Sequence, residues 1–450
     1  MQQPSSGATD AIAEFVLVTK AQAIPEMVRH EAKRSLLNII GCTIGGARHA
    51  AVETLWRGVG PFSGAPLVTL LGRATRTDAV TAALVNTFAS SINTFDDTHA
   101  EAIIHPSGPI MGTVLAVAEL RPVTGAALLD AFALGVEVAC RWSKAVSVAP
   151  AKGIIAWSQT GICSGVAAAA AAARLLGLDA ATTRRAIGIA ASQASGIRAM
   201  HGSMCTAMMP AQAGQTGLRA ALLAEAGFTA GENAFEGRYG FAECFSTAAH
   251  VAHLTAGLGT HWEILGNTYK PFPCGIVINP LIDAALQMRQ QHGLTGDMID
   301  NVAANCSPGA LALCDRPNPK DELEAQVSLY HWLAAAFVKG RASVPEGTDA
   351  AVRDPAMAAF RARIKATPDA TIPIDGCDLV VTLTDGRVLK HAVRDCIGSR
   401  GRPMTDRELE AKFMGLAEGI SPKERIARLI ADCWQCETLP RGATLAELAA

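Results

Sequence analysis

A run of small residues from Thr160 to Ala173, mostly alanine and glycine, limits what this chain can fold into. Residues of this kind favour helices that lie close together and are buried on most sides. The run stops at Arg174, and Gly177 follows where such a helix would end. It is too short to span a membrane, which takes about 20 apolar residues. The pattern therefore predicts a closely packed helical core, and we expect no membrane partner.

The overall composition excludes two classes of protein. Of the 450 residues, 50% are hydrophobic and 18% are charged, with 39 basic against 41 acidic side chains. A disordered chain needs low hydrophobicity and high net charge, and a protein that binds nucleic acid through electrostatics is strongly basic. The length suffices for one large domain or for two domains with substantial cores. We therefore expect a folded protein that does not bind nucleic acid.

The cysteines do not form a disulfide pattern. Twelve are dispersed along the chain, and only Cys433 and Cys436 make a CxxC, with no second pair to complete a zinc site. The N-terminal sequence MQQPSSGATDAIAEF lacks the basic-then-apolar pattern of a secretory signal. We therefore expect reduced thiols in the core and a cytoplasmic protein.

Helical periodicity dominates up to about residue 265, and the pattern changes near Asn267. The later part predicts further helices, a strand and a hairpin around Asp385-Gly386. We predict a mainly α fold: a large all-helical domain (1–267 plus 400–450) and a smaller α+β lid domain (268–399) inserted before the C-terminal helices. The predicted segments are helices over 25–44, 111–120, 160–176, 182–194, 216–226, 280–291 with Asn279 as N-cap, and 323–338; strands over 298–304, 378–384 and 387–393; and a last helical region from Thr405, with Glu408 completing a capping box.

The densest group of polar side chains runs from Asn93 to His99 and continues at His105-Pro-Ser107. It contains two adjacent carboxylates, Asp96 and Asp97, together with Thr98 and two imidazoles. These groups supply acids and bases, and the helix start beyond them offers free N–H groups to an anion. The same residues also fit an Asx-type turn followed by an N-cap. A metal site is disfavoured because the spacing matches no established ligand set.

Two other stretches carry candidate site residues. Arg198 and His201 precede a glycine-bearing segment, Gly202-Ser-Met-Cys-Thr-Ala, which is either a plain loop or part of a pocket wall. Lys270 lies in a proline-stiffened turn beside Tyr269, and no other lysine occurs between Lys152 and Lys270. This lysine is either an anion ligand or a solvated surface residue.

No motif asks for a cofactor. The sequence has no GxGxxG at a strand–helix junction, no GK[ST] phosphate loop, no GxSxG and no HExxH. The pairs His250-x-x-His253 and Cys433-x-x-Cys436 are interpreted as structural. We therefore expect neither a metal nor a nucleotide or flavin.

Motifs spread from about residue 12 to 430 resemble, in order, the 2-methylcitrate dehydratase (MmgE/PrpD) family. This resemblance implies a cofactor-free, usually dimeric enzyme with an active site between a helical domain and a lid. Relatives of this kind include 2-methylcitrate dehydratases, cis-aconitate decarboxylases and iminodisuccinate epimerases. The motifs are Phe95-Asp-Asp-Thr-His, His105-Pro-Ser, Leu115-Ala-Val-Ala-Glu119, Ala186-Ile-Gly-Ile-Ala-Ala-Ser-Gln-Ala-Ser-Gly196, Gly202-Ser-Met, Ala220-Ala-Leu-Leu-Ala with Gly227-Phe-Thr, Lys270-Pro-Phe-Pro-Cys, Pro280-Leu-Ile-Asp-Ala-Ala and Pro403-Met-Thr-Asp.

The chain departs from similar sequences mainly by losing charged groups. Neutral residues stand where those sequences carry Asp, His, Lys or Arg: Thr94, Ser158, Thr206, Met209, Gln212 and Asn279. Retained are Asp96, Asp97, Thr98, His99, His105, Arg198, Tyr269, Lys270 and His331. Because removal of a proton next to a carboxylate builds negative charge, each lost cationic donor costs about 3–4 kcal/mol of transition-state stabilisation. We therefore expect a substrate with fewer carboxylates, a different reaction, or lost activity.

The leading hypothesis is a cofactor-independent dehydratase acting by β-elimination on a small organic acid or related carbonyl compound. His105 would be the acid/base group, Asp97 would orient it or share protons with it, and Lys270 and Arg198 would bind carboxylate. The expected substrate-binding set is Asp96, Thr98, His99, Ser158, Arg198, Thr206, Gln212, Tyr269, Asn279 and His331.

Three alternatives stay open at this point. One is proton-transfer isomerisation or epimerisation without a leaving group, and another is decarboxylation on the same scaffold. The third is a non-catalytic descendant that binds a ligand through the old cleft. For all of them the resemblance implies a homodimer.

Overall fold

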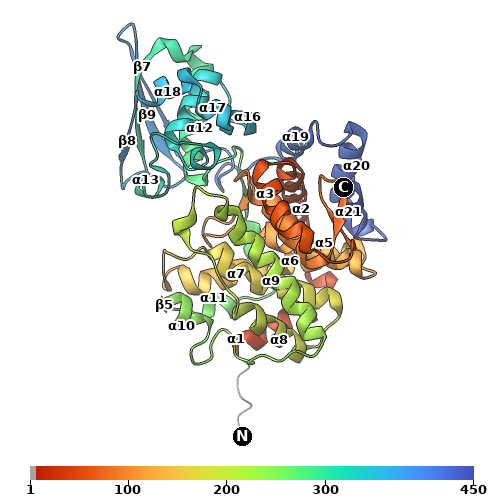
Figure 1. Ribbon diagram of the computed structural model, residues 1–450. Helices are drawn as coiled ribbons and strands as arrows, with labels where there is room; N and C mark the ends of the chain where they lie inside the picture. The colour runs from red at the N-terminus through yellow and green to blue at the C-terminus, as the bar shows by residue number, and fades with distance from the viewer. Residues whose placement is uncertain (1–6) are drawn as a thin grey trace.

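The computed structural model describes residues 7–450. Helices dominate this part of the chain, which confirms the predicted mainly α fold class. Buried hydrophobic side chains form two clusters, one from residues 8–269 and 404–449 and the other from residues 272–396. Figure 1 shows the elements of the second cluster as a small lobe beside a larger helical body. The predicted domain limits at residues 267 and 399 stay a prediction.

Long helices rich in alanine and glycine build the large body (Figure 1). In the longest small-residue run, every residue from Gln159 to Ala173 is buried, and Gly177 ends the helix with φ +69°. A Cβ on Gly217 would lie 2.4 Å from the Cβ of Ala168, so these two helices approach as closely as they do because that position is glycine. The principal helices are α2 (Glu26–Gly46), α4 (Ala79–Ser91), α5 (Ser107–Leu120), α6 (Gly125–Ser147), α7 (Gln159–Leu176), α8 (Ala180–Ala191) and α9 (Cys205–Glu225).

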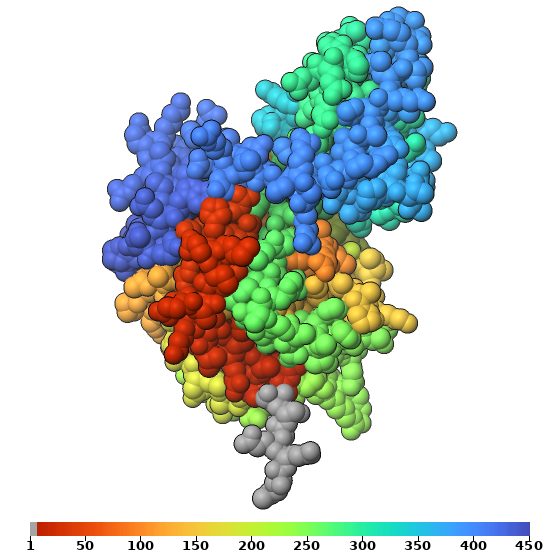
Figure 2. All heavy atoms as spheres, turned by 180° about the vertical axis from the view of Figure 1, so that it is seen from behind, coloured from red at the N-terminus to blue at the C-terminus, as the bar shows by residue number. Residues whose placement is uncertain are grey.

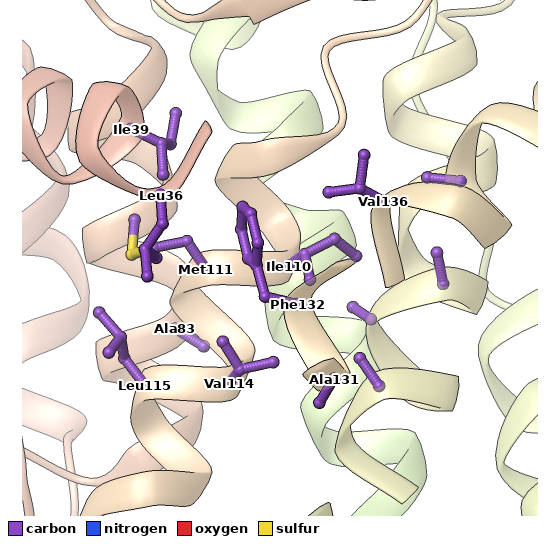
Figure 3. Packing of buried hydrophobic residues seen from close by; sticks show 14 of the residues in the cluster. Leu36, Ile39, Ala83, Ile110, Met111, Val114, Leu115, Ala131, Phe132 and Val136 are labelled. Carbon is purple, nitrogen blue, oxygen red and sulfur yellow. The ribbon is translucent and has the colours of Figure 1, made fainter. Parts of the chain in front are cut away.

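Branched and aromatic side chains fill the space between α2, α4, α5 and α6 (Figure 3). Ile110 and Val114 of α5 lie beside Phe132 of α6, and Leu36 of α2 lies on the other side of α5. All four of these side chains are fully buried. Burying a side chain of this size contributes about 1.5–3 kcal/mol, so this cluster is a rigid base for the segments above it.

Helix α9 begins at Cys205, well before the start expected at residue 216. Pro210 lies inside its first turns, where the missing N–H removes one main-chain hydrogen bond. Burial of Ala207, Met209 and Ala211 offsets that loss. As a result Thr206, expected in a loop, lies in the first turn of a helix.

Three two-stranded sheets were missed from the sequence because strands this short show no periodicity. They are β1 (Val68–Leu70) with β2 (Thr75–Thr77), β3 (Asp97–Thr98) with β6 (Thr268–Tyr269), and β4 (Lys152–Gly153) with β5 (Ser246–Ala248). The pair β3–β6 matters most, because it sets Asp97 opposite Tyr269 and Thr98 opposite Thr268.

The small lobe contains a four-stranded sheet in the order β10-β9-β7-β8. The predicted hairpin is confirmed, and its turn residue Gly386 has φ +87°. Strand β8 runs parallel to β7, and the other pairings are antiparallel. Helix α12 (Asn279–His292) packs against β9 and β10. The strands are β7 (Ile299–Cys306), β8 (Ile364–Pro368), β9 (Cys377–Leu383) and β10 (Val388–Val393).

Two local predictions in the lobe were wrong. Asn279 is the first residue of α12 and makes no N-cap hydrogen bond. The helix expected over 323–338 is broken into α14 (Glu322–Ala325) and α15 (Leu329–Ala334), followed by a π-helical turn, Ala335–Lys339. The break occurs because the side chain of Ser328 accepts a hydrogen bond from the main-chain N–H of His331 and starts a new helix.

The chain returns to the large body after the lobe. Helix α19 (Asp406–Ala417) carries the predicted capping box and packs against α2, as does α20 (Lys423–Trp434). Figure 2 shows the connection from the lobe to these helices crossing the back of the molecule. Where it crosses, Gly398 has φ +83° and a Cβ there would lie 2.6 Å from the main-chain oxygen of Tyr269, so the chain's exit from the lobe touches its entry.

The remaining helices are shorter or peripheral. No helix within residues 7–450 is long and apolar enough to cross a membrane. These helices are α1 (Ala8–Val18), α3 (Ala50–Val59), α10 (Phe241–Phe245), α11 (Ala252–Thr255), α13 (Pro308–Cys314), α16 (Val344–Gly347), α17 (Asp349–Val352), α18 (Pro355–Arg361) and α21 (Thr444–Ala449).

Candidate functional site

The β3–β6 pair brings two distant candidate segments together where the lobe joins the body. Lys270 follows β6, and its Nζ lies 2.6 Å from Oδ1 of Asp96, the residue before β3. Both side chains are almost entirely buried. An ion pair taken out of water in this way is held by its own geometry and neighbouring hydrogen bonds. Lys270 is therefore a partner of Asp96, and its ammonium is engaged inside the protein.

His105 is the accessible titratable group of this cluster. Its Nδ1 lies 2.8 Å from the main-chain oxygen of Asp97 and 3.0 Å from Oγ1 of Thr98. A carbonyl only accepts, so Nδ1 carries the proton and Nε2 keeps a lone pair. Within residues 7–450, Nε2 makes no hydrogen bond, and 38% of the side chain is exposed. Hydrogen bonds at Nδ1 thus fix the orientation of the imidazole and leave the basic Nε2 accessible.

The electrostatics keep His105 neutral. Loss of water contact in its recess lowers the pKa of His105, and the ammonium of Lys270 lowers it further against the opposing effect of Asp96. Burial raises the pKa of Asp96, but the charge of Lys270 and its hydrogen bond, helped by the charge of Lys412, contribute in the opposite direction, and the net shift is downward. A neutral imidazole beside an ionised carboxylate is suited to accept a proton near neutral pH.

The carboxylate of Asp97 is hydrogen-bonded to two other side chains. It accepts hydrogen bonds of 2.6 Å from Oγ of Ser107 and from Nδ2 of Asn267, and it faces away from His105. Burial raises its pKa to about 6. Asp97 contacts His105 through its main-chain oxygen, which fits the orienting role expected of it, and within residues 7–450 no hydrogen bond joins the two side chains.

Tyr269 also points away from His105. Side chains alternate along a strand, so Tyr269 and Lys270 face opposite sides of β6. The hydroxyl of Tyr269 is 2.8 Å from Oγ of Ser35 and donates to the carboxylate of Glu31, both on α2. Tyr269 therefore anchors the β3–β6 strand pair to α2, and the structure does not place its side chain beside the imidazole of His105.

A second group of cations borders His105. Arg198 donates to the main-chain oxygen of Trp157 at 3.0 Å and to Oε1 of Gln159 at 2.6 Å. Arg316, from the lobe, donates to the main-chain oxygen of His201 at 3.1 Å. Burial and the charges of Arg198, His105 and Arg316 lower the pKa of His201 to about 4, so His201 stays neutral. This side of the site carries guanidinium groups bound only to neutral oxygens.

Three predicted binding residues have local hydrogen bonds. Ser158 caps α7 by accepting from the N–H of Gly161. Thr206 accepts from the N–H of Gly202 and donates to the main-chain oxygen of Met200, which ties the loop after Arg198 to α9. Gln212 donates to Oγ1 of Thr216 within the same helix. Ser158 and Thr206 thus shape the segments beside Arg198, and the hydrogen bond of Gln212's side chain stays within α9.

Three further predicted residues are not joined to His105 by any contact in the described part of the chain. His99 is buried and donates from Nε2 to the main-chain oxygen of Glu263. His331 is buried in α15, where it donates to the main-chain oxygen of Glu346, and burial lowers its pKa to about 4. Asn279 is buried at the start of α12 and accepts from the thiol of Cys274. Their polar atoms stabilise turns and helix starts, and their expected role in substrate binding stays a prediction.

Lys412 of α19 was missed from the sequence. Its Nζ donates to the main-chain oxygens of Phe95 and Lys270, at 2.7 and 2.9 Å, and to Oδ1 of Asn38 at 2.8 Å. It also lies 3.9 Å from the ring centre of Phe95. Burial lowers the pKa of Lys412 to about 8. One ammonium thus links the two segments that carry Asp96 and Lys270.

Arg316 was not predicted as a site residue either. Neither Arg316 nor Lys412 lies in a sequence motif that would indicate a role at the site. Lys412 and Lys270 are 142 positions apart. In residues 7–450, His, Cys, Asp and Glu form no group of three or more that could hold a metal ion.

Comparison with known proteins covers nearly the whole chain. The model of the MmgE/PrpD N-terminal domain matches residues 10–253, and that of the MmgE/PrpD C-terminal domain matches residues 272–436. The cis-aconitate decarboxylase of Homo sapiens is 24% identical over 98% of this chain and 96% of that protein. The enzyme of the same name from Mus musculus is 25% identical over 96% and 92%, and that from Aspergillus terreus 23% over 94% and 92%.

Proposed function

The chain belongs to the MmgE/PrpD family, and from that premise we propose that it is a lyase acting on a small carboxylic acid, with His105 as its acid/base group. The family match confirms the resemblance drawn from the sequence motifs. The observation that carries the proposal is the geometry of His105, whose Nδ1 is tied to the main-chain oxygen of Asp97 while Nε2 is open. No metal or cofactor enters the proposed steps.

The proposed reaction begins with proton transfer at Nε2 of His105. The lone pair takes the proton from the carbon next to a substrate carboxylate, and the resulting imidazolium is stabilised by the main-chain oxygen of Asp97 and the nearby carboxylate of Asp96. The electron pair left behind spreads onto the substrate carboxylate. Guanidinium groups aimed at that carboxylate stabilise the growing charge, each by about 3–4 kcal/mol.

The leading outcome is dehydration. The carbon–hydrogen electron pair forms the new double bond, the adjacent carbon–oxygen bond breaks, and the departing hydroxide takes a proton from the imidazolium to become water. One imidazole can act first as base and then as acid, and the open Nε2 of His105 allows both transfers.

Decarboxylation is the second candidate, and the names of the relatives favour it. There the carbon–carbon electron pair forms a new double bond, the substrate's adjacent double bond shifts its electron pair onto the next carbon, and CO2 leaves. That carbon takes a proton from Nε2 of His105, which first has to accept this proton from water. Isomerisation or epimerisation would use only the first proton transfer and its reversal.

The experiment is a turnover assay on a panel of mono-, di- and tricarboxylates that includes cis-aconitate, with products identified by mass spectrometry. Loss of water, loss of CO2, or exchange of the substrate α-proton in heavy water without loss of mass distinguishes the three reactions. We expect His105→Gln to lower kcat by about 10²–10⁴-fold. The matched control is His292→Gln, since His292 is an exposed histidine at the end of α12.

Two results would contradict the proposal. One is full activity in His105→Gln with an unchanged melting temperature. The other is binding of acids without any turnover across the panel, which would favour a non-catalytic descendant.

We also propose a cytoplasmic homodimer, as the family resemblance implies. Multi-angle light scattering of the purified chain measures the assembly, and a monomeric mass would reject it.

A further inference from the structure

Arg316 reaches from the lobe to a loop of the large body. It follows α13, and its guanidinium donates to the main-chain oxygen of His201. A Cβ on Gly202 would lie 2.3 Å from Nη1 of Arg316, and Gly202 has φ +85°. Glycine at this position therefore permits both the loop conformation and the close approach of the guanidinium. The contact crosses the junction between the two buried clusters.

The charges of Arg198 and Arg316 are not compensated by the protein. Within residues 7–450, neither guanidinium forms an ion pair, and their hydrogen bonds go to main-chain and amide oxygens. Asp96 pairs with Lys270, and Asp315, the sequence neighbour of Arg316, accepts from the hydroxyl of Tyr330. Lys144 and Arg141 have carboxylate partners, whereas Arg174, like Arg198 and Arg316, donates to main-chain oxygens. Arg198 and Arg316 differ from Arg174 in their place beside His201, at the junction of the two clusters.

The contact of Arg316 with His201 brings the two guanidinium groups into one region. Arg198 begins the short helical turn that ends at His201, and Arg316 donates to the main-chain oxygen of His201. Consistent with this placement, both charges lower the pKa of His201, and the charge of Arg198 also lowers the pKa of His105. Arginine presents paired N–H groups that match a carboxylate in a two-pronged hydrogen-bond geometry.

We propose that Arg198 and Arg316 form a two-point receptor for a dicarboxylate, one guanidinium from each side of the junction, so that Arg316 determines specificity for the doubly charged acid. This inference rests on the proposed function and names its substrate class. A monocarboxylate leaves one guanidinium without an anion. A tricarboxylate brings a third negative charge for which these two guanidinium groups offer no further partner.

The test is binding of three acids of similar length that differ in charge, namely butanoate, succinate and propane-1,2,3-tricarboxylate, measured by isothermal titration calorimetry. We expect succinate to bind at least about tenfold more tightly than either of the others. Each charge-assisted hydrogen-bond pair contributes about 1.5–3 kcal/mol, which corresponds to roughly 10–100-fold in affinity.

The Arg316→Gln variant isolates the lobe's contribution. We expect it to weaken succinate binding by about 10–100-fold and butanoate binding by less than about threefold, because butanoate still binds at Arg198. Arg316→Lys, which keeps the charge but not the paired geometry, should fall between. Arg387→Gln, in the exposed hairpin turn of the lobe, is the matched control. Equal melting temperatures without ligand establish that the variants are folded.

The outcomes separate this inference from the lyase proposal. Equal losses for butanoate and succinate, or no loss for succinate, would overturn the receptor even if the enzyme turns over an acid. Charge-selective binding that depends on Arg316 supports the receptor even if no acid on the panel is turned over, a result that would reject the lyase alone.

Discussion

The two groups of charges around His105 differ in how the protein treats them. On one side, Asp96, Lys270 and Lys412 are enclosed, and every cation there has oxygens within hydrogen-bond distance that belong to the fold. On the other side, Arg198 and Arg316 are half-buried, and within residues 7–450 they pair with no carboxylate, so part of each guanidinium stays accessible to solvent. Enclosed charges must be satisfied for the chain to fold, whereas a charge left uncompensated at a junction is available to a ligand. The comparison predicts that removing the first group costs stability and removing the second costs binding.

The largest effect on stability is expected for Lys270→Met. The substitution leaves Asp96 buried without its partner, and loss of one member of a buried pair costs about 3–5 kcal/mol. Urea unfolding at neutral pH measures the free energy. The double variant Asp96→Asn with Lys270→Met should recover part of the loss, because neither charge is then left alone. If Lys270→Met alone were as stable as the unsubstituted protein, the enclosed charges would not differ from Arg198 and Arg316 in their contribution to stability.

A pH-dependent effect is expected from Asp97. Burial raises its pKa to about 6 in the folded protein, above that of the unfolded chain, so the folded state binds the proton more tightly. Its contribution is therefore fully present below about pH 4 and is lost as pH rises through about 6. The difference of about 2 pKa units corresponds to roughly 3 kcal/mol.

The Asp97→Asn variant checks this contribution. It should unfold with a flatter dependence of stability on pH between about 4 and 6 than the unsubstituted protein. Asp96 is the internal contrast, because its lowered pKa makes its contribution disappear as pH falls. Identical slopes in the two proteins would show that Asp97 does not titrate in this range.

Replacement of Lys412 by Met, which removes another enclosed charge, is also expected to lower the stability of the protein. The main-chain oxygens of Phe95 and Lys270 would lose a buried donor, which costs about 1–3 kcal/mol of unfolding free energy. We also expect the pKa of Asp96 to rise, because the Lys412 ammonium helps to lower it. Lys412→Arg should retain part of the stability, and Lys423→Met, at the exposed start of α20, is the control. A loss as large in the control would point to a general charge effect.

The smallest change in stability is expected for Arg198→Gln, at about 0.5 kcal/mol or less, in line with a substitution that breaks no buried ion pair. Its affinity for succinate should nevertheless fall by about tenfold or more. Thermal unfolding and calorimetric titration of one sample measure both quantities. A large stability loss without a binding loss would place Arg198 with the enclosed charges.

The predicted site residues that the structure brings together were indicated by local patterns in the sequence. Asp96, Thr98 and His105 belong to one polar stretch, and Lys270 stands in a turn whose prolines disfavour a helix. Their roles in catalysis stay a prediction. His331 was selected with the family's residues, and the structure places it in α15, where it is buried by the packing of the lobe and donates to the main-chain oxygen of Glu346.

Arg316 and Lys412 show why the remainder could not be predicted. Each reaches the site from a segment brought there by the return of the chain, and neither lies in a motif. The sequence predicted a site with few cations because neutral residues stand at positions where similar sequences carry charged ones. Ser158 and Thr206 occupy two of these positions and form local hydrogen bonds. In the folded protein cations enter from the lobe and from α19 instead. The strong helical periodicity of the sequence was enough to predict the mainly α fold. Strands β3 and β6 have two residues each, which is too short to show a periodicity of their own.

The contact of Gly398 with Tyr269 limits how the lobe can move. The segment that leads into the lobe touches the turn that leads out of it, so the two covalent connections between lobe and body pass through one place. Lys270 lies at this place, whereas Arg316 reaches the body at a separate contact, as does Gln326, which bonds to Thr94 and Ile92. The position of Lys270 is therefore fixed by the chain connections themselves, and that of Arg316 depends on how the lobe is seated against the body.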